Sequence, residues 1–271
     1  MRIAFVGGGN MAAAMIGGLL QQGFPAGDIA VVEVLAEARE RLARDYGVGV
    51  HAAPEVAVLS ADVVIMAVKP QQMREAARVL AQSLRNQLVV TIAAGITTGS
   101  LVSWLGGYRS IVRAMPNTPA LVRAGMAGLF ALSEVSAEGR QVAERLLRAV
   151  GKTVWVEEED QLDAVTALSG SGPAYVFYFL EAMQEAGRVL GLVDATARLL
   201  AEQTFLGASM LAAQSEEAPE LLRARVTSKG GTTEAALKAM ENSGVRGHVI
   251  AAIQAAAARS RELGREYGRA D

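Results

Sequence analysis

Cysteine is absent from the sequence, and histidine occurs only twice among the 271 residues. Without cysteine the chain has no disulfide bond, no thiolate nucleophile and no cysteine-ligated metal centre. His51 and His248 lie far apart in the chain, whereas the histidines of a metal site are usually closely spaced. We therefore expect no metal site, and we assign neither histidine a catalytic role.

A strong charge of one sign and a long apolar run are also missing. The formal net charge is −2, which gives no reason to expect nucleic acid or an anionic membrane as a partner. No apolar run approaches the ~20 residues of a membrane span, and the first run is too short for a secretory signal. These absences predict a cytoplasmic protein.

Apolar residues make up 51% of the chain, and in its first half they form short runs rich in valine and isoleucine. Such runs are typical of strands buried on both faces, and they occupy residues 3–6, 29–32, 63–68, 88–93 and 111–115. Amphipathic stretches at 11–22, 36–46, 71–84 and 100–105 alternate with them. This alternation predicts an α/β fold in which helices cover both faces of a parallel sheet.

The pattern changes near residue 160. Further strands at 125–132 and 153–156 and a helix at 137–149 precede the change. Beyond it strand signals fade, and helices are expected at 161–168, 174–190, 195–213, 219–225, 234–241 and 246–267. We predict an α/β domain at 1–159 and an all-helical domain at 160–271. The wide apolar faces of these helices favour oligomerisation, with a self-contained core as the alternative.

A glycine-rich loop follows the first strand and opens the first helix. Gly7-Gly8-Gly9-Asn10-Met11-Ala12 has the pattern G-x-G-x-x-A. Gly7 permits the tight turn, Gly9 lets the backbone approach a pyrophosphate, and Ala12 allows close packing of helix and strand. The helix N-terminus adds N–H groups and a positive dipole end. The loop predicts a Rossmann-type dinucleotide site, and a turn needed only for packing is the alternative.

Glu33 stands at the end of the second strand. An acid at this place hydrogen-bonds the ribose 2′-OH of NAD and repels the 2′-phosphate of NADP. Arg39 and Arg41 follow and could neutralise such a phosphate, and Glu33 could also be an ordinary solvated carboxylate. The choice between NADPH and NADH stays open at this point.

Several further motifs lie at strand ends or before helices, where open α/β sheets bind ligands. In chain order they are Val68-Lys69-Pro70, Ala93-Ala94-Gly95, Met115-Pro116-Asn117-Thr118-Pro119, Ser169-Gly170-Ser171-Gly172-Pro173 and Thr227-Ser228-Lys229-Gly230-Gly231-Thr232-Thr233. Together with the glycine loop, their order and spacing resemble the pyrroline-5-carboxylate reductase family from residue 1 to about residue 263.

The resemblance implies an N-terminal Rossmann-type, doubly wound sheet at 1–159 and a helical dimerisation and substrate domain at 160–271. It implies an oxidoreductase that passes a hydride from NADPH, with NADH left open, to the imine of Δ1-pyrroline-5-carboxylate. The product is L-proline, in the last step of proline biosynthesis. It also implies a homodimer formed through the helical domain and leaves open a larger ring such as a decamer.

The resemblance and the motifs together assign a set of cofactor contacts. They are Val6, Gly7, Gly9, Asn10, Met11, Glu33, Val68, Lys69, Pro70, Ala93, Ala94, Gly95 and Asn117. Lys69 would contact the nicotinamide ribose or a phosphate, and the alternative is an exposed lysine at a strand end. Asn117 would orient the nicotinamide carboxamide, unless it only serves the turn between two prolines.

The segment before the helix at 234–241 is expected to bind the substrate. Backbone N–H groups of Gly230, Gly231 and Thr232 can hold its carboxylate. The resemblance implies that Thr233 hydrogen-bonds the ring nitrogen, with Ser228 beside it, as the catalytic pair. Capping of the helix is the alternative role for the two threonines, and it can coexist with binding.

Two acidic residues match the family's pattern, and two other positions differ from it. Glu159 and Glu216 match acidic positions near its substrate site, although each lies in an acid-rich run typical of a solvated face. Lys229 stands where the family usually has proline, and Pro54 stands where many members have an asparagine near the adenine ribose. The turn at Lys229 is therefore less rigid or more positively charged, and no contact is carried over at Pro54.

Three rival interpretations are weaker. A hydroxy-acid reductase would need a helix lysine after the glycines near Gly170, and residues 175–183 contain none. A dinucleotide sensor without turnover would keep the first glycine loop but would have no need of the glycine–threonine anion site. A purely structural role leaves the motifs at strand and helix ends unexplained.

Overall fold

The protein is described by a computed structural model that covers residues 1–268. Contacts divide the chain into two compact units. The first consists of Met1–Ser171 together with the chain from Ala256 onward, and the second is Gly172–Ala255. The first unit thus extends past residue 159 and includes the last turns of the final helix up to residue 268. The functional domains at 1–159 and 160–271 stay a prediction.

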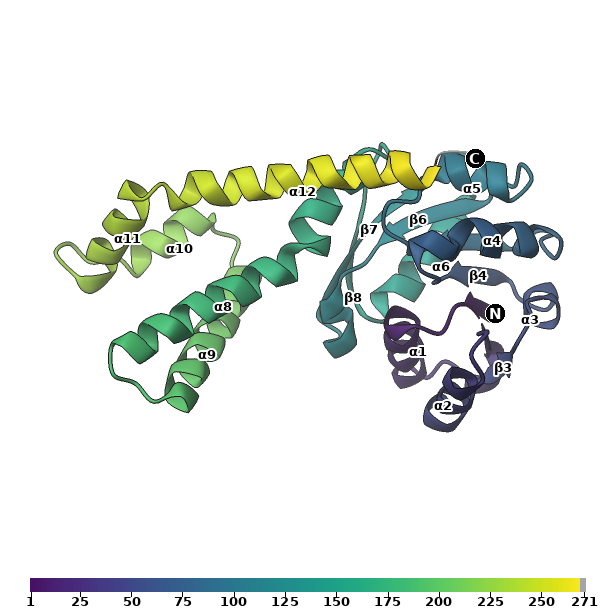
Figure 1. Cartoon of the computed structure of the whole chain (residues 1–271), viewed down its shortest axis with the longest axis horizontal. Helices are drawn as coiled ribbons and strands as arrows, with labels where there is room; N and C mark the ends of the chain where they lie inside the picture. The colour runs from purple at the N-terminus through teal and green to yellow at the C-terminus, as the bar shows by residue number, and fades with distance from the viewer. Residues whose placement is uncertain (269–271) are drawn as a thin grey trace. The chain divides into compact units, whose positions relative to one another are not determined.

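An eight-stranded sheet forms the centre of the first unit, in the order β3-β2-β1-β4-β5-β6-β7-β8 (Figure 1). The strands are β1 Ile3–Val6, β2 Ile29–Val32, β3 Gly49–His51, β4 Val63–Met66, β5 Leu88–Thr91, β6 Ile111–Met115, β7 Gly125–Ala131 and β8 Gly151–Trp155. Strands β1 to β6 pair in parallel, and every residue of β1, β4 and β5 is buried. Burial on both faces explains the runs of valine and isoleucine, and the predicted Rossmann-type sheet is confirmed.

Strand β7 reverses the direction of the sheet by pairing antiparallel with β6. The link between them holds only the short helix η2, Thr118–Val122. A parallel neighbour needs a crossover of ~12 or more residues, so a link this short favours an antiparallel one. The apolar pattern of residues 125–132 predicted a strand here but carried no information on its direction. Strand β3 was not predicted, because three residues beginning with a glycine are too few to show a period.

Helices cover both faces of this sheet. They are α1 Asn10–Gln21, η1 Ala26–Asp28, α2 Ala36–Tyr46, α3 Glu55–Leu59, α4 Pro70–Ala81, α5 Thr98–Trp104, α6 Ala137–Arg148, α7 Gln161–Val165 and the π-helical turn η3 Thr166–Gly170. Alternate strand residues face opposite layers. Phe5 is buried in one layer with Met15 of α1, and Met66 in the other with Met73 of α4. Each such side chain contributes about 1.5–3 kcal/mol when buried, so the two layers hold the sheet between them.

The second unit is helical. Its helices are α8 Gly172–Val189, α9 Asp194–Gln214, α10 Pro219–Arg225, α11 Thr232–Asn242 and the first part of α12 Val245–Gly268. Helices α8 and α9 form an antiparallel pair (Figure 1), in which a Cβ on Gly187 would lie 2.8 Å from Cβ of Ala197. Large apolar side chains such as Phe177, Leu199 and Leu211 remain exposed on this unit. Among residues 1–268, no helix is both long and apolar enough to cross a membrane.

Candidate active site

The glycine loop between β1 and α1 has the geometry of a phosphate cradle. Gly7 has φ +101°, and a Cβ there would lie 2.8 Å from the carbonyl carbon of Ala67, so only glycine fits. At Gly9 an added Cβ would have no heavy atom of the described residues within 4 Å. Gly9 is also the N-cap of α1, and no described side chain caps this helix. The N–H groups of Asn10 and Met11 therefore face an open approach suited to an anion.

The loop after β2 is tied to the glycine loop. The carboxylate of Glu33 accepts hydrogen bonds from the N–H of Gly8 and the N–H of Leu35, each at 3.0 Å. The guanidinium of Arg39 donates to the carbonyl oxygens of Glu33 and Val34 at 2.7 and 2.9 Å. Glu33 thus orders two loops, a task that the sequence alone did not indicate. Each carboxylate oxygen keeps a further lone pair, and the ribose contact stays a prediction.

The ends of β1, β4 and β5 meet at one edge of the sheet. The N–H of Ala67 donates to Val6 O at 2.8 Å, and the N–H of Ile92 donates to Met66 O at 3.1 Å. This places Val68, Lys69 and Pro70 beside the glycine loop, with the loop of Ala93, Ala94 and Gly95 next along the edge. Lys69 is the exposed N-cap of α4. Carboxyl ends of parallel strands are where such sheets bind ligands.

Asn117 is engaged within the first unit. Its side-chain oxygen accepts from the N–H of Met126 at 2.9 Å, and its amide nitrogen donates to the carbonyl and hydroxyl oxygens of Ser169 at 3.1 and 3.2 Å. These bonds join η2 to β7 and η3. A local turn role was the alternative expected for Asn117, but its partner Ser169 lies 52 positions further along the chain. The predicted contact with the nicotinamide carboxamide stays a prediction.

Glu159 lies in a half-buried polar network at the same edge. It accepts from Thr98 N at 2.7 Å and from Thr98 Oγ1 at 2.5 Å, and Arg113 Nη1 lies 2.8 Å from it. The Arg113 side chain is 6% exposed and that of Glu159 is 20% exposed. Thr98 begins α5, directly after the loop that carries Gly95. Glu159 therefore anchors this loop, and the acid-rich run around it gave no sign of that role.

Breaking the Arg113–Glu159 pair should destabilise the first unit. Arg113→Met leaves a half-buried carboxylate without its cation, and we expect a loss of about 2 kcal/mol, below the range for fully buried pairs because Glu159 keeps some solvent contact. Thermal unfolding measures the loss. Adding Glu159→Gln should restore part of it by removing the unpaired charge. Equal midpoints for Arg113→Met and the unchanged protein would contradict the expectation.

The predicted substrate residues lie on the second unit, except for Glu159. The loop between α10 and α11 carries Ser228, and the N–H of Gly231 donates to Ser228 O at 3.0 Å. Gly230 has φ +72°, which a glycine adopts at low cost. Gly231 is the N-cap of α11, so Thr232 and Thr233 begin the helix without capping it. Glu216 is exposed on the segment before α10.

Glu234 is a residue of this loop region that the sequence reasoning missed. Its carboxylate accepts a hydrogen bond of 2.6 Å from the N–H of Gly230. A glutamate in the first turn of a helix that reaches back to a preceding N–H is a known capping arrangement. The bond shows that this N–H is directed where a carboxylate can accept from it. The sequence did carry a signal for this bond, since Glu234 stands three residues after Gly231, the spacing of a capping glutamate.

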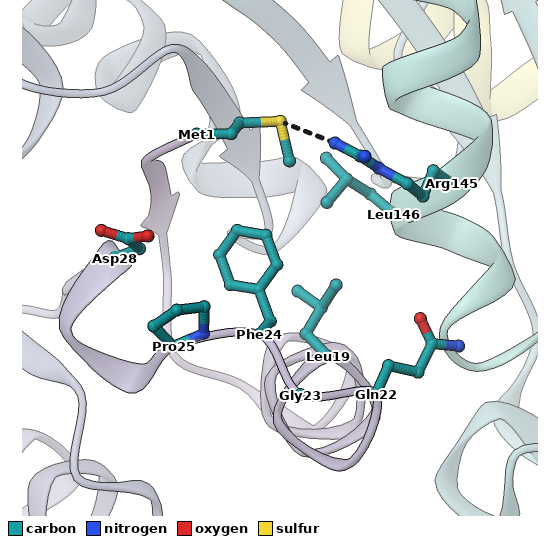
Figure 2. A pocket seen from close by; sticks show the side chains of 9 residues that line it. All are labelled: Met1, Leu19, Gln22, Gly23, Phe24, Pro25, Asp28, Arg145 and Leu146. Carbon is teal, nitrogen blue, oxygen red and sulfur yellow. Dashed lines mark hydrogen bonds between the residues drawn. The ribbon is translucent and has the colours of Figure 1, made fainter.

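A separate hollow lies at the opposite, amino edge of the sheet (Figure 2). It is lined by Leu19, Phe24 and Leu146, with Asp28 and Arg145 also at its wall. Arg145 Nη2 lies 3.4 Å from the sulfur of Met1. Because open α/β sheets bind their ligands at the carboxyl edge, this hollow is no candidate for the active site.

Known protein families match both the α/β part and the helical part of the chain. Residues 2–95 match the family model described as NADP oxidoreductase, coenzyme F420-dependent, and residues 159–263 match the model for pyrroline-5-carboxylate reductase dimerisation. The fold and the glycine loop thus define a dinucleotide-dependent oxidoreductase with a dimerisation region.

Full-length relatives narrow this class. A pyrroline-5-carboxylate reductase of Pseudomonas aeruginosa is 50% identical over 98% of both chains, and one of Haemophilus influenzae is 46% identical over 96% of this chain and 97% of its own. A solved pyrroline-5-carboxylate reductase from Coxiella burnetii superposes with a TM-score of 0.92 at 44% identity, covering 97% of this chain and 98% of that one. The chain belongs to the pyrroline-5-carboxylate reductase family.

Proposed function

We propose that this protein reduces the C=N bond of Δ1-pyrroline-5-carboxylate to give L-proline, the last step of proline biosynthesis, with NADPH as reductant and NADH as the alternative. The observation that carries the proposal is the 50% identity to a reductase of this name over 98% of both chains. The open glycine loop on the first unit and the glycine–threonine loop on the second support it.

The first unit fits a dinucleotide. A Cβ at Gly7 would strike backbone, Gly9 is open, and the start of α1 carries no described side-chain cap, so backbone N–H groups can receive the pyrophosphate. Lys69, at the N-cap of α4, would hold the nicotinamide ribose or a phosphate. When bound, the reduced nicotinamide supplies the hydride. The chain's own contribution is to place that ring against the small residues of the Ala93–Ala94–Gly95 segment.

The second unit supplies the groups proposed for the substrate. Backbone N–H groups of Gly230, Gly231 and Thr232 would hold the carboxylate. It would take the place of the Glu234 carboxylate at the Gly230 N–H and of Ser228 O at the Gly231 N–H. The Thr233 hydroxyl would donate a hydrogen bond to the lone pair of the ring nitrogen, with Ser228 beside it. This bond would stabilise the negative charge that develops on nitrogen as hydride reaches the imine carbon, and the nitrogen would then take a proton from water. An exposed Lys229 next to Gly230 adds positive charge for the carboxylate.

The remaining assignments are part of the same proposal. Glu159 and Glu216 would lie near the substrate, with Glu159 acting from the network that it forms with Thr98 and Arg113. The functional domains would be 1–159 for the cofactor and 160–271 for dimerisation and substrate. We propose a cytoplasmic homodimer formed through the helical domain, which leaves a larger ring such as a decamer open. The exposed apolar side chains of α8 and α9 support burial between subunits.

The direct test follows oxidation of NADPH and of NADH at their near-ultraviolet absorbance, with pyrroline-5-carboxylate as substrate. Turnover with either reductant is the expected result. Folded protein that binds the cofactor but turns over neither would contradict the assignment and favour a sensor or another imine as substrate.

Glu33 should influence the choice between the two reductants. Glu33→Gln removes a negative charge at the end of β2 and keeps one acceptor for the N–H of Gly8 or Leu35. We expect the ratio of kcat/KM for NADPH over NADH to rise by about tenfold, since a charge beside the 2′-position disfavours a phosphate. Glu40→Gln, an exposed change of the same charge on α2, is the matched control. An equal rise of this ratio in both variants would show that the effect comes from the net charge of the protein and not from the position of Glu33.

A further inference from the structure

The end of α12 covers the loop between β5 and α5, residues 92–97, which we name the 92–97 loop. A Cβ on Gly95 would lie 3.1 Å from Cδ2 of Tyr267 and 3.3 Å from Cβ of Leu263. A Cβ on Gly264 would lie 3.7 Å from the carbonyl oxygen of Gly95. The last turns of α12 and helix α5 lie side by side in Figure 1. Residues 263–267 of α12 thus pack directly on a loop assigned to the nicotinamide.

Tyr267 also contacts the first turn of α4, directly after Lys69. Its hydroxyl accepts a hydrogen bond of 3.1 Å from Nε2 of Gln71. Gln71 follows Lys69 and Pro70 at the start of α4. The half-buried ring of Tyr267 packs against the buried cluster of that face of the sheet. A single side chain therefore joins the start of α4 to the loop after β5.

Ala93 and Ile96 fix two points of the 92–97 loop in the buried core, and the turn at Ala94 and Gly95 between them is held from outside the loop. Gly95 has φ +72°, and glycine loses more conformational freedom on ordering than any other residue. The downstream end of the loop is held by Glu159, which accepts from both Thr98 N and Thr98 Oγ1. Its middle is held by the cover from α12. A loop ordered before binding costs less entropy when a ligand arrives.

We propose that Tyr267 and Leu263 are positioning residues for the dinucleotide, which keep the 92–97 loop and the start of α4 in their binding arrangement. The inference rests on the proposed function for the identity of the cofactor. The match to the family's dimerisation model ends at residue 263, so Tyr267 lies beyond it. These residues act through the loops and take no part in the chemistry.

The test compares Tyr267→Ala with Arg265→Ala, an exposed change on the same turn of α12. The dissociation constant of NADP⁺ is measured by titration calorimetry, and amide hydrogen exchange of the 92–97 loop is measured in protein without cofactor. For Tyr267→Ala we expect the dissociation constant of NADP⁺ to rise by about tenfold and amide exchange in the 92–97 loop to become faster. A tenfold rise corresponds to the entropy cost of ordering roughly one more backbone residue on binding. Arg265→Ala should match the unchanged protein in both measurements.

Tyr267→Phe separates the two contacts of this side chain. It keeps the ring over Gly95 and loses the bond from Gln71, so exchange of the 92–97 loop should return close to that of the unchanged protein. All variants are compared well below their unfolding temperatures. A role confined to overall stability would lower the unfolding temperature of Tyr267→Ala and leave its exchange in this loop and its NADP⁺ affinity unchanged, which would overturn the inference.

The outcomes also distinguish this inference from the proposed function. If the unchanged protein binds NADP⁺ but does not reduce pyrroline-5-carboxylate, the proposed function fails, and the two binding measurements still decide the role of Tyr267. If it reduces the substrate while Tyr267→Ala binds NADP⁺ with unchanged affinity, the inference alone fails.

Discussion

Replacing Thr233 by alanine should lower kcat/KM for pyrroline-5-carboxylate by about 100-fold, the lower end of the effect of removing one preorganised donor. Thr233 lies in the first turn of α11, and the N-cap of that helix is Gly231, so the proposed role of the hydroxyl does not compete with capping. The affinity for NADP⁺ should stay unchanged. Steady-state kinetics with saturating NADPH measures the effect.

Two controls make this prediction sharp. Thr233→Ser keeps the hydroxyl and should recover most of the activity, which a packing role for the methyl group would not allow. His248→Ala changes an exposed side chain of α12 and should leave kcat/KM unchanged. Near-normal activity of Thr233→Ala would remove Thr233 from the proposed mechanism and direct attention to Ser228.

Adding one methyl group to the glycine loop should separate cofactor binding from folding. Gly9→Ala places a Cβ where no described atom lies within 4 Å and where φ is −72°, so the protein should fold with unchanged stability. The methyl group would occupy the approach of the pyrophosphate, and we expect the dissociation constant of NADPH to rise by about 100-fold. Fluorescence titration of NADPH, together with thermal unfolding, checks both parts.

Gly7→Ala and Gly27→Ala are the two controls for Gly9→Ala, one at a crowded position and one at an open position. At Gly7 a Cβ would lie 2.8 Å from backbone atoms at φ +101°, so we expect a loss of about 2 kcal/mol or more in stability as well as lost binding. Gly27, in η1, has no described atom within 4 Å of its Cβ position and should be neutral in both assays. Normal NADPH binding by Gly9→Ala would show that the phosphates do not approach this loop.

Local patterns predicted most of the secondary structure, because the faces on which a helix or strand is buried set the spacing of its apolar residues. Strands β1, β4 and β5 are buried on both faces and are almost wholly apolar, with Thr91 as their one polar residue. Their ends were less certain, since 63–68 and 88–93 were predicted where the strands end at Met66 and Thr91. The residues beyond each end stay apolar or small because they enter the loops at the carboxyl edge. Pairing partners lie elsewhere in the chain and set where a strand stops.

The proposed site could be located from the sequence only as far as its motifs are local. Gly7, Gly9 and the helix start at Asn10 form one continuous segment, so the glycine spacing was enough to predict an anion cradle. Asn117 and Glu159 were found as candidates, but their contacts with Ser169 and Arg113 were not predicted. Those contacts depend on how the crossover connections bring distant segments to one edge.

The sequence by itself determined the parallel sheet, the glycine turn before α1 and the helical second half, because each arises from neighbouring residues and from the pattern of burial. Only the tertiary structure decided that Glu33 accepts from the N–H of Gly8, that β7 runs antiparallel and that Tyr267 lies over Gly95. Each of these joins segments that are separate along the chain. Such contacts form once the layers pack, and no period or motif in a single segment encodes them.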